Sequence, residues 1–166
     1  MTIYLVVPLL VTLAILQSTI VSHFRMWGVF ADLPLLVVVS WSLLRGPWEG
    51  LIWGFIAGAA VDIFSGAPFG AATFGLIAAG LLSGLGQSTV FRSQLFLPLL
   101  AMLLATIVYD MLFLIVVSIS GYSVSWMDSL LHLILPSAVL NAVLTPVVFV
   151  IMRWLKTRLG REEMEL

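Results

Sequence analysis

Long apolar runs separated by short polar connections dominate the chain. A bilayer core of about 30 Å is crossed by roughly 20 helical residues, so runs of this length predict transmembrane helices. Five runs qualify, and they cover residues 3–22, 48–64, 71–87, 95–119 and 129–154. The pattern therefore predicts an all-α protein that crosses the membrane several times.

A sixth apolar run, 33–44, has only twelve residues between Asp32 and Arg45. Asp32 is a favourable N-cap, and Pro34 suits the first turn of a helix. Such a short helix crosses a bilayer only if its ends snorkel or the bilayer thins locally. We expect six transmembrane helices, the second one short, in a single integral membrane domain of residues 1–166.

The basic residues favour a topology with both termini in the cytoplasm. If all six helices cross, six of the seven basic residues share a side with Met1, and only Arg25 lies opposite. Basic residues concentrate in cytoplasmic loops. If 33–44 were re-entrant, five spans with an outside N-terminus would place all seven inside. We favour six spans, because a re-entrant backbone needs protein or water around it.

The composition supports a membrane protein and narrows its chemistry. Of 166 residues, 62% are hydrophobic and 9% are charged, whereas a soluble domain carries about 25% charged residues. The net charge of −1 provides no basic field for nucleic acid. The chain has no cysteine, which removes disulfides and thiolate chemistry.

Small residues line one side of the third and fourth spans. Gly54, Gly58 and Asp62 follow one another at intervals of four residues, and Gly66 and Gly70 lie in the connection to the fourth span. Small residues let helix backbones approach closely in a membrane. We expect an antiparallel pair and favour packing within the chain. In the alternative interpretation, a membrane helix of a partner protein binds to part of this surface.

A polar stripe runs along the last span. Ser137, Asn141 and Thr145 recur every four residues, between Pro136 and Pro146. Each proline removes a backbone donor and frees a carbonyl four residues earlier. We expect nearby hydroxyls or the Asn141 amide to compensate. The stripe indicates a packing seam or hinge rather than a ligand site.

Acidic residues gather at the predicted outer pole. Asp62 lies about 21 Å along the third helix from Trp48, near its outer end, and Asp110 has a similar depth in the fifth span. With Asp32 and Asp128, the group indicates helix caps and solvated loop charges. For Asp62 and Asp110, a functional role or pairing between helices has equal weight, because a carboxylate beside a glycine-lined groove can cap a neighbour's helix or pair with an Arg of another chain.

Catalytic and metal-binding motifs are absent from the sequence. There is no Ser-x-x-Lys, His-Glu-x-x-His or Gly-x-Ser-x-Gly, and no phosphate-binding loop. His23 and His132 have no companion ligands in the sequence. We therefore expect no enzymatic activity, no cofactor and no metal.

The stretch RGPWEGLIWGFIAGAAVDIFSGAPFGAATFGL combines spaced glycines, one Asp at a helix end and a glycine-containing turn. With the short second span that opens DLPLLVV, and with Asn141 and Pro146 of the last span, the chain resembles the MreD family. This family is the small integral membrane component of the bacterial rod-shape, or cell-elongation, machinery. The resemblance covers nearly the whole chain.

The resemblance implies a non-enzymatic scaffold in the bacterial cytoplasmic membrane. Its implied partners are the bitopic protein MreC and, directly or through MreC, the RodA glycosyltransferase and its class B penicillin-binding transpeptidase, which build the lateral peptidoglycan wall. A homodimer is left open. The small-residue groove that ends in a carboxylate suggests the docking surface for MreC's membrane helix: the outer halves of the third and fourth spans, with Gly54, Gly58 and Asp62 central. Gly66, Gly70 and Asp110 of the fifth span complete the expected contact residues.

The family is also similar in fold to the S components of energy-coupling-factor transporters, which gives the alternative function of a substrate-binding subunit. The coupling motif Ala-x-x-x-Ala of that class is missing here from the first span, which offers only Ala14. A flippase-like or channel role is a third reading, but no charge is expected at mid-membrane.

Overall fold

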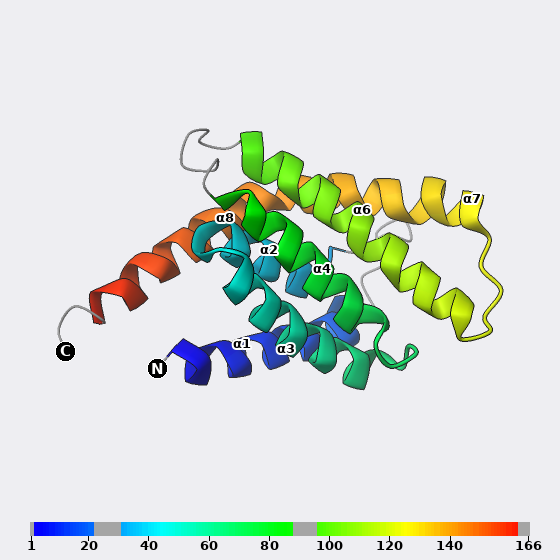
Figure 1. Cartoon of the computed structure of the whole chain (residues 1–166), viewed down its shortest axis with the longest axis horizontal. Helices are drawn as coiled ribbons and strands as arrows, with labels where there is room; N and C mark the ends of the chain where they lie inside the picture. Colours follow the sequence, from blue (N-terminus) through cyan, green and yellow to red (C-terminus); the bar gives the residue numbers. More distant parts are fainter. Residues whose placement is uncertain (1, 22–30, 88–95, 163–166) are drawn as a thin grey trace.

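The computed structural model describes residues 2–21, 31–87 and 96–162, which are helical apart from short connections (Figure 1). The helices, in chain order, are α1 (Thr2–Leu16), η1 (Gln17–Val21), α2 (Leu33–Arg45), α3 (Pro47–Ser65), α4 (Ala71–Leu85), α6 (Phe96–Ile119), α7 (Trp126–Ser129), η2 (Leu130–Ile134) and α8 (Leu135–Glu162). The two η segments are π-helical turns. The all-α class is confirmed.

Each of the six expected segments is helical, and the main difference is one of length. Among the described residues, three helices are long and apolar enough to cross a membrane: Pro47–Ser65, Phe96–Ile119 and Trp126–Arg158. The last extends beyond both ends of the expected 129–154 because α7, η2 and α8 follow one another without a break. Three shorter apolar helices accompany them: Val7–Thr19, Leu33–Arg45 and Ala71–Leu85.

The short helix α2 forms the centre of the bundle. Eleven of its 13 residues are buried, and α1, α3, α4, α6 and α8 all pack against it. Figure 1 shows it enclosed between these longer helices. A helix that is apolar on all sides is buried on all sides. One anchor is the stacked pair of Trp41 and Trp53 of α3, whose ring centroids lie 4.4 Å apart.

Helices α3 and α4 form the expected antiparallel pair in backbone contact. A Cβ added at Gly54 would lie 2.5 Å from the carbonyl oxygen of Leu76, and one added at Gly58 would overlap the Cα of Thr73. The small-residue face of α3 is therefore covered by α4 of the same chain. Packing within the chain, the favoured reading, is what the structure contains.

Substituting Gly58→Leu should push the α3–α4 pair apart, because the new side chain would meet the α4 backbone, which cannot rotate away. Overpacking at such a site costs more than about 2 kcal/mol of unfolding free energy. The matched control is Ala59→Leu, since half-buried Ala59 lies one turn from exposed Phe55. Thermal unfolding of both variants in detergent measures the difference; equal stability would contradict the close contact.

Candidate functional site

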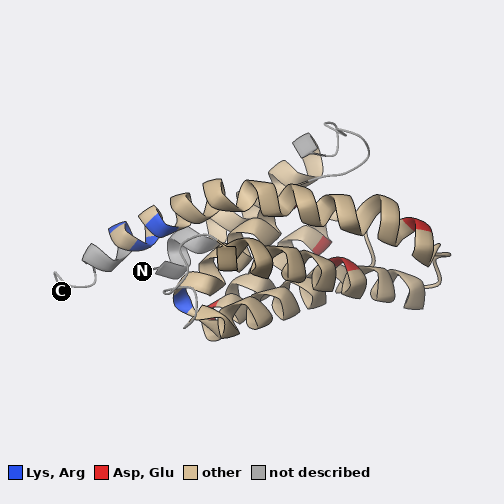
Figure 2. Ribbon diagram, turned by 90° about the horizontal axis from the view of Figure 1, so that it is seen from above, with Lys and Arg blue, Asp and Glu red and all other residues tan. Residues whose placement is uncertain are grey.

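Charged side chains segregate along the bundle (Figure 2). We call one end the cationic end, because it carries every Lys and Arg whose side chain the structure describes: Arg45, Arg153, Lys156 and Arg158. We call the opposite part the acidic half. Asp32 caps the start of α2, whose other end carries Arg45; Asp62 lies near the end of α3, Asp110 lies in α6 and Asp128 lies in α7. Arg25 and His23, expected near these acids, lie outside the described residues.

Asp62 is buried and fully hydrogen-bonded. Its side chain is 4% exposed. The carboxylate accepts hydrogen bonds from the backbone N–H groups of Gly70 (2.9 Å), Ala72 (2.9 Å) and Thr73 (3.1 Å), and from the Thr73 hydroxyl (2.6 Å). The first N–H groups of a helix have no partner within the helix, and they favour an anion. Asp62 at the end of α3 therefore caps the start of α4.

The turn between the two helices depends on glycine. Gly66 ends α3 at φ +68°, and Gly70 precedes α4 at φ +101°, a region that other residues rarely adopt. Gly66 is exposed, and a Cβ added there would contact nothing, whereas the backbone N–H of Gly70 donates to the Asp62 carboxylate. Contrary to the docking expectation, Gly54, Gly58 and Asp62 do not form an open surface, because α4 covers all three.

The first turn of α2 is capped from three directions. The Asp32 side chain accepts from the backbone N–H of Leu35 at 3.1 Å, as the sequence predicted. Gln17 of η1 accepts from the N–H of Leu33 at 3.0 Å, and Asn141 of α8 accepts from the N–H of Asp32 at 3.0 Å. Residues distant in the sequence therefore satisfy backbone donors that α2 buries inside the bundle.

Asn141 links three helices. It is 0% exposed. Its amide donates to the hydroxyl of Thr106 in α6 at 3.3 Å, while its side-chain oxygen binds α2. Ser137 and Thr145 are buried on the same side of α8, as a packing seam requires. Pro146 lies within continuous α8.

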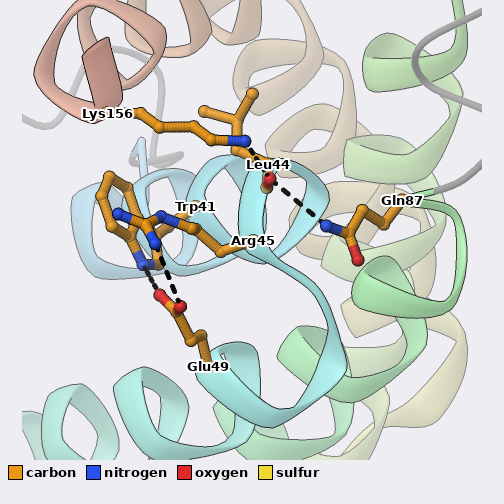
Figure 3. Close-up of polar contacts among 6 residues, drawn as sticks. All are labelled: Trp41, Leu44, Arg45, Glu49, Gln87 and Lys156. Carbon is orange, nitrogen blue, oxygen red and sulfur yellow. Dashed lines mark hydrogen bonds and ion pairs between the residues drawn. The ribbon is translucent and has the colours of Figure 1, made fainter. Parts of the chain in front are cut away.

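The other end of α2 is capped at the cationic end (Figure 3). The Leu44 carbonyl accepts hydrogen bonds from Lys156 of α8 at 2.7 Å and from Gln87 at 3.4 Å. Beside it, Glu49 accepts from the Trp41 indole at 2.8 Å and lies 3.7 Å from Arg45. Sequence reasoning missed Lys156 and Gln87. The sequence did contain one signal: a helix as short as α2 ends inside the protein, so its terminal carbonyls need hydrogen-bond donors there.

Asp110 differs from Asp62 in having no hydrogen-bond partner among the residues that the structure describes. Its Oδ2 atom is buried and unpaired within the described part of the chain, as are Ser40 Oγ and Arg45 Nε. Asp32 and Asp110 are near enough for their carboxyl groups to influence each other electrostatically. Among the described residues, Asp110 is thus the one acidic side chain with a buried oxygen that lacks a partner.

The buried polar side chains act mainly on the protein's own backbone. Asp62, Asn141, Gln17 and Lys156 all contact helix ends. Among the described residues, no three His, Asp or Glu side chains are arranged to hold a metal ion. Fold and site together define an all-helical membrane protein whose polar interior fastens its helices to one another.

The particular family follows from comparison with known proteins. The family described as rod shape-determining protein MreD matches residues 1–155, and the chain belongs to this family. The resemblance drawn from the glycine-spaced stretch is confirmed, and membership implies a role in determining rod shape. No curated protein and no solved structure matches the chain.

Replacing Asp62→Asn should destabilise the fold, because one oxygen becomes an NH₂ group that faces backbone donors of α4. The expected loss is about 3 kcal/mol of unfolding free energy, the scale of losing charge-assisted bonds and leaving buried donors unpaired. Asp128→Asn is the control, since Asp128 is exposed. Thermal unfolding in detergent measures the difference between the two variants. Equal unfolding midpoints would show that Asp62 does not stabilise the start of α4.

Replacing Asn141→Leu should cost about 1–2 kcal/mol, because the Asp32 N–H loses its acceptor inside the bundle. Thr106→Val removes the other partner of Asn141. A double-mutant cycle should then give a combined loss smaller than the sum of the single losses. Strictly additive losses would show that the two side chains do not interact.

Proposed function

We propose that this protein is a non-enzymatic scaffold of the bacterial elongation complex. In this proposal it binds an MreC-like bitopic protein and, directly or through it, supports the RodA-type glycosyltransferase and the class B penicillin-binding transpeptidase. The observation that carries the proposal is the family match over residues 1–155. The use of buried polar groups for helix ends supports it, because a scaffold needs a rigid, internally satisfied bundle.

In the proposed arrangement the protein sits in the cytoplasmic membrane and crosses it six times. Both termini then face the cytoplasm, with the cationic end inside and the acidic half outside. The three short helices, including Leu33–Arg45, span the bilayer with local thinning. The caps of α2 support this placement, because its ends find polar partners within the protein and need no water.

A mild-detergent pull-down of the tagged protein from native membranes tests the proposal. Mass spectrometry should find an MreC-like bitopic protein together with wall-synthesis enzymes, and an unrelated tagged membrane protein of similar size should not capture them. Depletion of the protein in a rod-shaped bacterium should produce round cells. Recovery of an energising module with paired ATPases would instead favour the substrate-binding subunit of a transporter.

A further inference from the structure

Asp110 lies within an apolar helix and has no hydrogen-bond partner among the described residues. It is the only charged residue of α6, fourteen residues and about 21 Å from its start. Its Oδ2 atom is buried and has no hydrogen-bond partner within the described residues. A charged group within an apolar membrane helix is costly, so such residues indicate functional contacts unless a neighbour in the bundle satisfies them. Asp62 has such neighbours, whereas Asp110 does not.

The position of Asp110 around α6 shows from which side a partner can reach it. Tyr109 packs on Gly75 of α4, and Thr106 is bonded to Asn141 of α8. At 100° per residue, Thr106 lies about 60° and Asp110 about 100° around the helix from Tyr109. Asp110 therefore lies just beyond the α8 contact, at the edge of the packed face, and its side chain is only partly buried.

Beyond this level, the α6 surface on the same side is incompletely covered. Leu114 and Val117, one and two turns further along the Asp110 stripe, are half-buried. Leu131 and Leu133 of η2 are 50% and 42% exposed. Figure 1 shows α6 and α8 diverging towards α7. An apolar surface with a carboxyl group at its inner end thus lies on the α8 side of α6.

Charge indicates what fits this surface. Asp32 lies near Asp110, and no described Lys or Arg is found in the acidic half (Figure 2). Two neighbouring carboxyl groups have no described cation beside them, and a basic side chain brought to this point would stabilise their ionised form. Arg and Lys form the strongest hydrogen bonds to carboxylates. The complementary occupant is therefore an apolar helix that carries one basic side chain.

We propose that Asp110 binds an Arg or Lys carried by a membrane-spanning helix of a partner protein, which packs along α6 on its α8 side. The inference rests on the proposed function, because it supplies the contact for the partner of the scaffold. The partner helix contacts Leu114 and Val117. Its basic side chain reaches Asp110 from the partly exposed edge.

Site-specific photo-crosslinking in native membranes tests this contact in the full-length protein. A photoreactive benzoylphenylalanine at position 114 should crosslink to a single-span protein, while the same group at position 74 should not, since exposed Phe74 lies on α4. Asp110→Asn should reduce the crosslink yield by about tenfold, as expected for loss of one buried ion pair. Asp110→Glu should retain much of the yield. Peptide mapping should place the crosslink within one turn of an Arg or Lys.

A stability measurement separates a contact residue from a structural one. Because Asp110 has no partner in the described chain, Asp110→Asn should keep the unfolding midpoint of the purified protein within about 2 °C of the wild type. Arg25, which lies outside the described residues, is the alternative partner for Asp110 within the same chain. If Asp110→Asn and Arg25→Gln lower the midpoint equally, the carboxylate pairs within the chain and the proposal is overturned.

Two further outcomes distinguish this inference from the proposed function. If Asp110→Asn crosslinks as efficiently as the wild type, the partner complex stands but the Asp110 contact is wrong. If the wild type captures its partner in the pull-down yet crosslinks only from position 74, the docking face lies elsewhere. If the wild type captures no partner, the scaffold function itself fails.

Discussion

The structure depends on satisfying the backbone at both ends of α2, a helix too short for its environment. Inside an apolar bundle, an unpaired N–H or C=O costs several kcal/mol, and neither lipid nor water is available to replace the bond. The partners come from elements far away in the chain: Gln17 and Asn141 at the first turn, and Lys156 and Gln87 at the last carbonyls. These contacts fix the positions of η1 and α8 around the central helix.

The same requirement distinguishes the two carboxylates that the sequence alone could not separate. Asp62 accepts bonds from the start of α4 and holds the hairpin closed. Asp110, within α6, has an unpaired buried oxygen instead. Asp62 therefore serves the fold itself, whereas the described bundle assigns the Asp110 side chain no such task.

The sequence predicted the helices and the local caps because both depend on near neighbours. Apolar length located the six segments, Asp32 with Pro34 marked the start of α2, and spaced glycines indicated the α3–α4 pair. The sequence did not determine whether α4 covers the small-residue face of α3, because an open groove and one filled by a neighbouring helix have the same residue pattern. Nor could it predict that Lys156 reaches Leu44, a contact across 112 positions that only the tertiary fold creates.

The most direct test of the central role of α2 is amide hydrogen exchange of the protein in nanodiscs. Residues of a first helical turn usually exchange readily, because their N–H groups lack helical partners. Here the amides of Asp32, Leu33 and Leu35 should exchange as slowly as those at the middle of α2, and Asn141→Leu should selectively accelerate Asp32. The account would be contradicted if the first-turn amides exchanged as fast as exposed loop amides, or if Asn141→Leu left the exchange of Asp32 unchanged.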